Sequence, residues 1–530
     1  MPSRHGDASL CRNDDAKVHE YRPPGELELP AFARRDGRHR LHRPVAAVIG
    51  AATHGRFVAP QRPESRSPMI ARMLSLLALV LACVWPQPSR AENPIIQTSF
   101  TADPAPLVHK GVVYLYTGQD EDDAREFKMR NWRLYTSTDM SNWTDKGVVA
   151  SLATFPWALQ DNDAWASQVV ERDGKFYLYA SVSVQGWPKS VIAVAVADRP
   201  EGPFKDALGK PLIDKAIGYF DPTVFVDDDG QAYMYWGNPN LYYVKLNRDM
   251  ISYSGEIQQA EGKPRNYQEG PWFYKRQGKY YMAYASACCP EGIGYAMSDK
   301  PTGPWVYKGD IMDHNANSTG NHPGIVDYMG ASYLFGFNYR LNFADTPIHR
   351  ERRSVTVTRF DYNADGSINM LPWWDNVGVP PLKPLSPYER VEAETMAWTS
   401  RLKRDRDRQF DWAPGIKTAR DDKVGVYVTH ITDLDYIKVN GVDFGSKGAA
   451  RFVASLASET DGGKIELRLD SVDGPHLGTL TVARTGRPDQ WQQQSAPVSG
   501  ATGVHDLYLI FRGRGEPTIF EFDHWRFERK

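Results

Sequence analysis

The chain has 530 residues, of which 41% are hydrophobic and 24% are charged, and its formal net charge at pH 7 is −2. This composition is typical of a globular protein and excludes a largely disordered chain. A nucleic-acid-binding protein usually carries a basic surface, so the near-neutral charge predicts no nucleic-acid partner. No apolar run approaches the length of about 20 residues that a transmembrane helix needs, so we expect no membrane span.

The N-terminal 91 residues differ from the rest of the chain. Residues 1–68 are rich in Arg and Pro and show no sustained periodicity. Residues 69–91 then combine a positive segment at Arg72, an apolar run from Leu74 to Val84 and a small-residue end at Ser89-Arg90-Ala91. This is the pattern of a secretory signal peptide. We expect translation to start inside residues 69–91 and the mature protein to be secreted or periplasmic. Residues 1–68 are then a wrongly assigned start or, as the less favoured alternative, a disordered extension.

The cysteine content indicates that disulfides do not hold the fold together. The chain has four Cys, and Cys11 and Cys83 precede the expected mature N-terminus. The other two, Cys288 and Cys289, are neighbours. They form either a vicinal disulfide or two buried thiols, and we favour the thiols. Hydrophobic cores must therefore stabilise the fold.

A five-fold internal repeat predicts the architecture of the first part of the chain. In each repeat a turn Gly is followed by an aromatic-rich strand, and the five Gly residues are 63, 56, 48 and 52 residues apart. Asp-Gly turns and period-2 alternation indicate hairpins. A period of this length fits about four strands, which is one propeller blade. The sequence therefore predicts an all-β fold with a five-bladed β-propeller over residues 94–385.

The residues that begin the first strand of each repeat predict the functional site. Eight or nine positions before the turn Gly stand Asp103, Trp165, Asp221, Glu269 and His322. The innermost strands of a propeller surround its axis, so these side chains are expected to converge at one end of it. Three of them are carboxylates, which are almost never buried without a partner. A single carboxylate at the start of a strand can be explained as a cap of the strand, but three carboxylates at equivalent positions cannot.

Clustered carboxylates suit glycoside hydrolysis. In that reaction one carboxylic acid protonates the departing oxygen and one carboxylate activates water or attacks the sugar. A third carboxylate raises the pKa of the acid by like-charge repulsion. Trp165 offers a surface on which a sugar ring can stack. His322 lies where a metal ion on the axis would be.

In these residues the chain resembles glycoside hydrolase family 43, a five-bladed propeller family of inverting enzymes that act on xylan and arabinan. The resemblance covers residues 94–385 and rests on motifs that begin or contain the residues above. They are Asp103-Pro104, Asp221-Pro222-Thr223, Glu269-Gly270-Pro271, Asn321-His322-Pro323-Gly324, and Arg352-Arg353-Ser354-Val355.

The resemblance implies a role for each matched residue. Asp103 would be the general base, Asp221 the pKa modulator and Glu269 the general acid. His322 matches an axial histidine that is associated with a hydrated calcium ion. Arg353 matches an arginine that contacts the reacting sugar and the modulating Asp. No organic cofactor is implied.

The last 143 residues, 388–530, form a second predicted domain after a Pro-rich linker. Short strands with Gly turns predict a β-sandwich of the jelly-roll type, and its outline resembles carbohydrate-binding module family 6. Glu392, Glu394 and Asp523 would hold a structural calcium ion through hard oxygen ligands, although a solvated edge strand is the alternative. The module pattern is broken where sugar is usually bound, which leaves Trp412 and Trp491 as uncertain substitutes.

These features predict a secreted, monomeric, inverting hydrolase that releases terminal α-L-arabinofuranose or β-D-xylose from plant cell-wall polysaccharide. Two alternatives remain open. A related five-bladed hydrolase acts on fructans with retention, but its Trp-Met-Asn-Asp-Pro-type segment is absent around Asp103. A non-catalytic sugar-binding propeller would use the same carboxylates for binding and would turn over no aryl glycoside.

Overall fold

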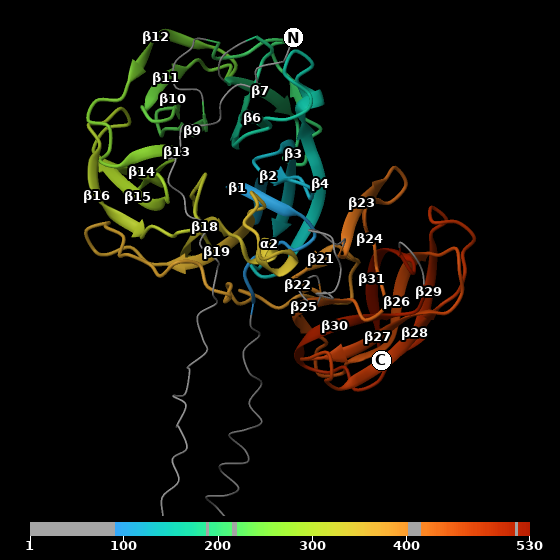
Figure 1. Cartoon of the computed structure of the whole chain (residues 1–530). Helices are drawn as coiled ribbons and strands as arrows, with labels where there is room; N and C mark the ends of the chain where they lie inside the picture. The colour runs from blue at the N-terminus through green and yellow to red at the C-terminus, as the bar shows by residue number, and fades with distance from the viewer. Residues whose placement is uncertain (1–90, 187–189, 215–219, 401–414, 515–517) are drawn as a thin grey trace, which may run out of the picture. The chain divides into compact units, whose positions relative to one another are not determined.

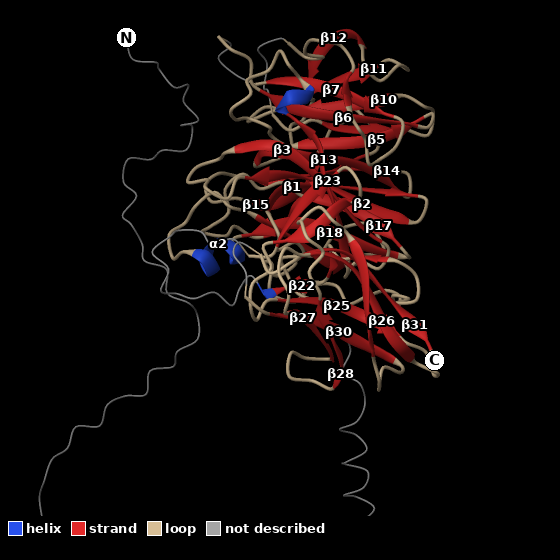
Figure 2. Cartoon of the chain, turned by 90° about the vertical axis from the view of Figure 1, so that its right-hand side faces the viewer, coloured by secondary structure: helices blue, strands red, loops and turns tan. Residues whose placement is uncertain are grey.

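The computed structural model describes residues 91–186, 190–214, 220–400, 415–514 and 518–530. The expected leader 1–68 and all of the expected signal peptide except Ala91 lie outside these residues. The described part is almost entirely β-structure, as Figure 2 shows, and its helical segments include the short η1 (Leu152–Thr154) and α2 (Arg340–Asp345). None of the described helices is long and apolar enough to cross a membrane.

Five sheets that follow one another along the chain form the propeller (Figure 1). The first contains β1 (Phe100–His109), β2 (Val112–Asp120), β3 (Met129–Ser137) and β4 (Trp143–Ser151). The second contains β5 (Ser167–Arg172), β6 (Lys175–Val182), β7 (Val191–Ala197) and β8 (Lys205–Asp206). The third contains β9 (Thr223–Val226), β10 (Ala232–Trp236), β11 (Tyr242–Leu246) and β12 (Tyr253–Gln259). The fourth contains β13 (Tyr267–Arg276), β14 (Lys279–Ser286), β15 (Gly292–Ser298) and β16 (Val306–Met312). The fifth contains β17 (Gly324–Tyr328), β18 (Ala331–Asn338) and β19 (Ser354–Phe360).

The repeat of turn glycines is the local origin of these blades. Each of the five lies between the first two strands of a blade with φ between 76° and 81°, namely Gly111, Gly174, Gly230, Gly278 and Gly330. Glycine adopts this left-handed conformation at no steric cost. The hairpins therefore form at the predicted positions, and the all-β, five-bladed prediction is confirmed.

Two blades differ from the expected four strands. The fifth sheet has three described strands, β17-β18-β19. The first sheet has five, because β21 (Thr395–Met396) from the second half of the chain pairs with β4. The sequence repeat predicts the hairpin that starts each blade. It cannot predict an added edge strand, because that strand comes from a distant segment outside the repeat.

The first strands of the blades lie next to one another around the axis. β1 contacts β5 and β17, and β9 contacts both β5 and β13. The approach of β17 to β1 is close enough to require glycine, since a Cβ on Gly324 would lie 2.4 Å from the carbonyl oxygen of Pro104 and 2.5 Å from Cδ of Pro106. Gly324 thus lets the fifth blade close onto the first, beside Asp103.

The second domain is a sandwich of two antiparallel sheets. One has the order β23-β24-β31-β26-β29, with β20 paired to β31, and the other has the order β22-β25-β30-β27-β28. The bounds are β20 (Val391–Glu392), β22 (Trp398–Thr399), β23 (Lys417–Asp421), β24 (Gly425–Thr429), β25 (Tyr436–Asp443), β26 (Ala449–Ala457), β27 (Gly463–Leu469), β28 (His476–Val482), β29 (Gln492–Pro497), β30 (Val504–Arg512) and β31 (Glu521–Arg529). Alternate residues of β27, such as Ile465 and Leu467, are fully buried in a core of their own. The predicted β-sandwich is confirmed.

The sandwich and the first blade share polar contacts as well as β21. Arg133 of β3 donates to Asp145 of β4 over 2.7 Å and to Oγ1 of Thr418 over 3.0 Å, and Thr418 donates to the same carboxylate over 2.6 Å. Asn142 and Asn440 exchange hydrogen bonds of 2.8 and 2.9 Å. The four residues Arg133, Asp145, Asn142 and Asn440 are all buried. The propeller and the sandwich therefore supply hydrogen-bond partners to each other's buried polar groups.

Candidate active site

The five predicted residues all stand at the start of an innermost strand. Asp103 lies within β1 and Glu269 within β13, whereas Trp165, Asp221 and His322 each lie two residues before β5, β9 and β17. Asp103, Asp221 and His322 are buried, with 5%, 8% and 5% of their surface exposed. The hydrogen bonds and charge interactions described below connect them, so the propeller brings them together as predicted.

Backbone irregularities direct the carboxylates away from the regular sheet. Asp103 and Asp221 have φ of 52° and 63°, in the left-handed region. The pairing register of β1 shifts between Ala102 and Ala105, and that of β13 shifts on both sides of Glu269. Bulges of this kind re-aim side chains next to active sites. Left-handed non-glycine residues cost of order 1–3 kcal/mol each and cluster at functional sites.

Arg353, which directly precedes β19, is the partner of Asp103. Its Nη1 donates to Oδ1 of Asp103 over 2.8 Å, and its Nε, Nη2 and backbone N–H donate to the carboxylate of Asp120 over 3.1, 2.9 and 2.8 Å. All three residues are buried. Burial raises the pKa of Asp103, while the charge and the hydrogen bond of Arg353 lower it and favour the carboxylate.

The position of Arg353 corrects one expectation. The resemblance implied that this arginine contacts the modulating Asp221, but its hydrogen bonds to described carboxylates go to Asp103 and Asp120. Asp120, at the end of β2, was missed. The register of the first hairpin pairs Asp120 with Phe100, close to the start of the strand that carries Asp103, so hairpin pairing was the signal that could have identified it.

Asp221 is held by two backbone groups and joins the other carboxylates electrostatically. Its N–H donates to Oγ of Ser181, and its Oδ2 accepts from the N–H of Gly270, both over 3.0 Å. Burial raises the pKa of Asp221 to about 7, the charges of Glu269 and Asp103 raise it as well, and His322 opposes the shift. The hydrogen bond from the N–H of Gly270 therefore connects Asp221 to the backbone directly after Glu269.

Gly270 makes this linkage possible. It has φ of 58°, and a Cβ at this position would lie 2.8 Å from the carbonyl oxygen of Asn321 and 3.3 Å from Nδ1 of His322. The backbone of the Glu269 bulge therefore packs directly against the segment before β17. Only glycine fits both the left-handed conformation and this close approach.

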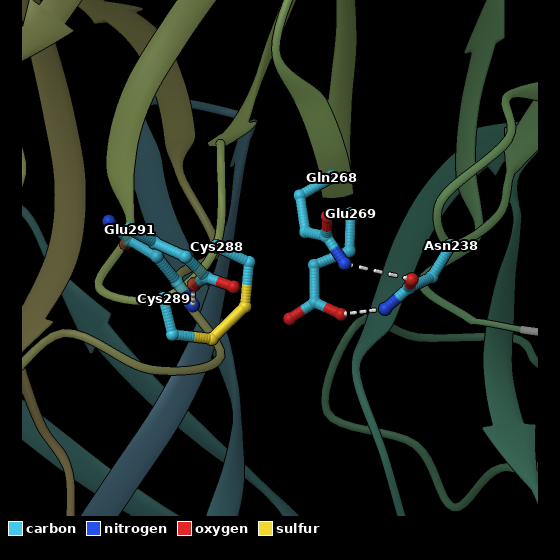
Figure 3. The surroundings of a disulfide bond; sticks show 7 residues. Asn238, Gln268, Glu269, Cys288, Cys289 and Glu291 are labelled. Carbon is cyan, nitrogen blue, oxygen red and sulfur yellow. Dashed lines mark hydrogen bonds between the residues drawn. A yellow bond between two sulfur atoms is a disulfide. The ribbon is translucent and has the colours of Figure 1, made fainter. Parts of the chain in front are cut away.

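Glu269 is a half-buried carboxyl group with one fixed oxygen. Nδ2 of Asn238 donates to its Oε2, and Oδ1 of Asn238 accepts from Nε2 of Gln268 over 3.0 Å (Figure 3). Burial raises the pKa of Glu269, and the negative charges of Glu291 and Asp103 raise it further. This environment favours the protonated form, which a general acid needs.

Glu291 is a fourth carboxylate at the site that the sequence analysis missed. It is 1% exposed, and its Oε2 accepts from the N–H of Asn321, beside His322, over 2.5 Å. Burial raises the pKa of Glu291, and the charge of Asp221 acts in the same direction. It directly precedes β15 in the turn from β14, whose last residue pairs with Gly292. An acidic residue in that turn was the available signal.

Trp165 is half-buried beside the arginine cluster. Its ring lies edge-on to Phe127, with 6.2 Å between ring centres. Phe127 in turn lies under the guanidinium of Arg353, 4.9 Å from its centre. The aromatic residues and Asp103 are thus connected through Arg353, and Trp165 lies beside the expected base with part of its surface exposed.

His322 by itself does not provide a calcium site. Calcium prefers six to eight oxygen ligands, and the imidazole offers nitrogen. Burial lowers the pKa of His322, so it is neutral at pH 7. Among the described residues, the one group of three or more Asp, Glu, His or Cys side chains with ligand atoms within 4.8 Å of one another is Cys288, Cys289 and Glu291. The axial calcium ion remains a prediction.

The expected calcium ligands of the sandwich are also arranged differently from the prediction. Arg390 lies 2.8 Å from Oε2 of Glu392 and 3.0 Å from Oδ1 of Asp523, so a guanidinium occupies the place of a cation between them. His524 takes the other oxygen of Asp523 over 2.6 Å. Glu394 is buried, and its Oε2 has no hydrogen-bond partner in the described structure. As placed, Glu392, Glu394 and Asp523 do not fit a calcium ion.

Two further expectations concern residues outside the site. Trp412 lies outside the described residues, and Trp491 packs against Tyr427 with 5.1 Å between ring centres. Cys288 and Cys289 form a disulfide and both are exposed. The favoured prediction of two buried thiols was therefore wrong, because the pair lies in a surface turn and not in a strand of the core.

Comparison with known proteins decides the family. Residues 91–368 match the family model of glycosyl hydrolases family 43. The chain belongs to this family. Residues 408–529 match the carbohydrate binding module (family 6). The protein is thus an O-glycosyl hydrolase with an attached module, which sets aside both the fructan-type hydrolase and the non-catalytic propeller.

Relatives with known names extend over both domains. An arabinoxylan arabinofuranohydrolase of Bacillus subtilis is 32% identical and covers 83% of this chain and 92% of its own. A second one, of Paenibacillus polymyxa, is 31% identical and covers 82% and 74%. The crystal structure of a family 43 arabinoxylan arabinofuranohydrolase from Bacillus subtilis in complex with cellotetraose matches with a TM-score of 0.70 at 32% identity, covering 83% of this chain and 97% of that one. A xylosidase/arabinosidase of Bacteroides ovatus is 30% identical but covers 52% of this chain and 95% of its own.

Proposed function

We propose that this family 43 hydrolase removes terminal α-L-arabinofuranose from arabinoxylan with inversion of the anomeric centre. The observation that carries the mechanism is the contrast between the neighbours of two carboxyl groups, the buried one of Asp103 and the half-buried one of Glu269. Burial raises the pKa of Asp103, but the charge and the hydrogen bond of the Arg353 guanidinium oppose that rise. Glu269 lies beside Glu291 and other carboxylates, which favours its protonated form. The pKa of both groups is raised by burial, but the strongest neighbouring charge acts in opposite directions on the two, and this difference assigns the base and the acid.

In this mechanism Asp103 removes a proton from a water molecule as the water attacks the anomeric carbon. Glu269 gives its proton to the departing glycosidic oxygen. Asp221, which accepts a hydrogen bond from the N–H of Gly270, is the modulator in this mechanism, because its negative charge and that of Glu269 repel each other. Trp165 holds the sugar that reacts by stacking, and Arg353, whose guanidinium binds Asp103 and Asp120, keeps the base in place.

The preference for arabinose over xylose rests on the relatives that share both domains. The two arabinoxylan arabinofuranohydrolases cover more than four fifths of this chain, whereas the xylosidase/arabinosidase covers about half of it, 52%. A module next to the catalytic domain suits a polymer that is bound at more than one place. Release of β-D-xylose from xylo-oligosaccharides, or of arabinose from arabinan, is the alternative substrate choice.

The surroundings of the reaction are part of the same proposal. The signal-peptide pattern in residues 69–91 supports export, so the protein acts as a secreted or periplasmic enzyme. A monomer is part of the same proposal. The enzyme needs no organic cofactor. A calcium ion on the axis near His322 is retained as a prediction, and no step of the reaction depends on it.

The substrate preference is tested by assaying the enzyme on a panel of substrates at equal molar concentration. It contains wheat arabinoxylan, an arabinosylated xylotriose, debranched arabinan, and the 4-nitrophenyl glycosides of α-L-arabinofuranose and β-D-xylose. We expect arabinose as the only monosaccharide from arabinoxylan, and the arabinofuranoside to be the better aryl substrate. Xylose as the main product would favour the alternative, and turnover of none would refute the proposal.

The roles of the two carboxylates are tested by their dependence on the leaving group. Nitrophenolate leaves almost unaided, whereas a sugar alkoxide needs a proton. Glu269→Gln should therefore reduce kcat/KM on the arabinosylated xylotriose by about 10²–10⁴-fold, the usual contribution of general acid catalysis, and affect the aryl glycoside much less. Asp103→Asn should reduce both by similar factors, because every leaving group needs the activated water. Equal damage from Glu269→Gln on both substrates would reject its assignment as the acid.

A further inference from the structure

The turn between β14 and β15, residues 287–291, lies at the acid side of the active site. In the strand register Glu269 pairs with Ala285, and Ser286 pairs with Gly292. The turn therefore closes the second hairpin of the blade directly beside the strand that carries Glu269. Its Cys288 and Cys289 are exposed and disulfide-bonded to each other.

Hydrogen bonds on both sides hold this turn in place. The N–H of Ala287 donates to the carbonyl oxygen of Asn266 over 2.6 Å, and the N–H of Glu291 donates to the carbonyl oxygen of Ser318 over 3.0 Å. The Glu291 carboxylate accepts from the backbone of Asn321 over 2.5 Å. The turn is thus tied both to the segment before β13 and to the segment before β17, so the disulfide has a fixed position.

The sulfur atoms face the carboxyl groups of the site. One ligand atom from each of Cys288, Cys289 and Glu291 lies within 4.8 Å of the others. Sulfur atoms that bond to each other are not thiolates, which are the form that binds metals, so this group is not a metal site. In Figure 3 the disulfide lies between Glu291 and Glu269.

The orientation of Glu269 shows on which side its proton is delivered. Its Oε2 accepts from Asn238, which leaves the other oxygen to carry the proton. In Figure 3 that oxygen points toward the disulfide and away from Asn238. An acid transfers its proton over a hydrogen bond of about 2.6–3.2 Å, so the departing oxygen must lie on the disulfide side of Glu269.

We propose that the Cys288–Cys289 disulfide forms a wall of the subsite that binds the departing sugar, a xylopyranose unit of the main chain. This inference rests on the proposed function, which makes Glu269 the acid and a sugar the leaving group. The faces of a xylopyranose ring carry C–H groups, and sulfur is a soft, polarizable partner for such apolar contacts. Ligand sites in proteins combine apolar walls with a few placed polar groups, here Glu269 and Glu291.

The test compares two substrates that differ only in what departs. Arabinosylated xylotriose and methyl α-L-arabinofuranoside both release an alkoxide, so both need the proton from Glu269, but only the first places a sugar ring against the disulfide. The full-length protein is assayed in its oxidised form, after reduction by dithiothreitol, and as the double variant Cys288→Ser/Cys289→Ser. Reduction is a two-electron transfer that opens the S–S bond to two thiols while dithiothreitol closes to its cyclic disulfide, and thiol titration verifies it. Val306→Ser, an exposed apolar position of 55% exposure on β16 of the same blade, is the matched control.

We expect opening or removal of the disulfide to lower kcat/KM on the arabinosylated xylotriose by about tenfold, the low end of what loss of a contact in a binding pocket produces. The loss should be mainly in KM, and the methyl arabinofuranoside should change less than twofold. An equal effect on both substrates, or none, overturns the inference while leaving the proposed function intact. If the oxidised protein hydrolyses neither arabinofuranoside, both fail. If the serine variant does not fold, the reduced wild-type protein decides.

Discussion

Nη1 of Arg353 lies 2.8 Å from Oδ1 of Asp103, while the rest of the same guanidinium binds Asp120. The expected catalytic base thus shares its only described ion-pair partner with a second buried carboxylate. Because Arg353 lowers the pKa of Asp103 against the effect of burial, its charge sets the pH below which the base becomes protonated.

Replacing the Arg353–Asp120 pair by neutral groups should therefore raise the pKa of Asp103. The double variant Arg353→Gln/Asp120→Asn removes one buried charge of each sign and leaves Asp103 as the one carboxylate that has lost the guanidinium. Arg353→Gln alone would leave two such carboxylates, and each unpaired buried charge costs about 3–5 kcal/mol. The acidic limb of the double variant's kcat/KM profile should move to higher pH, because Asp103 then becomes protonated, and inactive as a base, at a higher pH than in the wild type. Arg359→Gln, at an exposed ion pair of β19, is the control. An acidic limb that does not move would show that another group than Asp103 is the base.

Glu291 should control the opposite side of the pH profile. Its negative charge is the largest charge contribution that raises the pKa of Glu269, with Asp103 acting in the same direction and Arg353 and Asn238 against it. Glu291→Gln removes that charge but keeps an oxygen to accept from Asn321. The basic limb of kcat/KM should then move to lower pH, because Glu269 loses its proton earlier. Glu126→Gln, at an exposed position, should leave both limbs in place, and an unchanged basic limb in Glu291→Gln would contradict the interpretation.

Asp221 should make the fold less stable as the pH rises. Its pKa is raised from 3.8 to about 7 by burial, so the folded state favours the protonated form. The corresponding stability is fully present below pH 4 and is lost as the pH rises through 7. At 1.36 kcal/mol per pKa unit, the loss amounts to about 4 kcal/mol.

The variant Asp221→Asn mimics the protonated form at every pH. Thermal unfolding at pH 8 should show a higher Tm for Asp221→Asn than for the wild type, whereas the two should unfold at similar temperatures at pH 4. Its activity should fall, since the modulating charge is gone. A Tm difference that is the same at both pH values would mean that ionisation of Asp221 is not its source.

The prediction from sequence was most successful where hairpin periodicity determines position. Asp103, Asp221 and Glu269 could be identified because each stands eight or nine positions before a turn Gly. Asn238 and Glu291 were missed because they lie in connections between strands, and the approach of a connection to the axis is set by tertiary packing; the acidic side chain of Glu291 in its turn was only a weak signal. The disulfide was missed for the same reason, because the sequence alone does not show whether Cys288 and Cys289 lie in an exposed turn or in a buried strand.

The sandwich should stabilise the propeller without taking part in the chemistry. A chain that ends after Leu385 loses β21 from the first sheet and exposes Arg133 and Asp145, which Thr418 covers. Its Tm should fall, whereas the activity of the folded fraction on the aryl arabinofuranoside should be retained, because every proposed site residue lies between 103 and 353. Full-length Thr418→Val is the milder control. A folded but inactive shortened chain would place part of the active site in the sandwich.

The stereochemistry of the first product tests the central claim most directly. Activation of water by Asp103 and protonation by Glu269 require a single displacement, which inverts the anomeric centre. Proton NMR of arabinosylated xylotriose with a large amount of enzyme, recorded within the first minutes, should show β-L-arabinofuranose before the α-anomer appears by mutarotation. If α-L-arabinofuranose appears first, the reaction retains configuration and the assignment of Asp103 as a base is wrong.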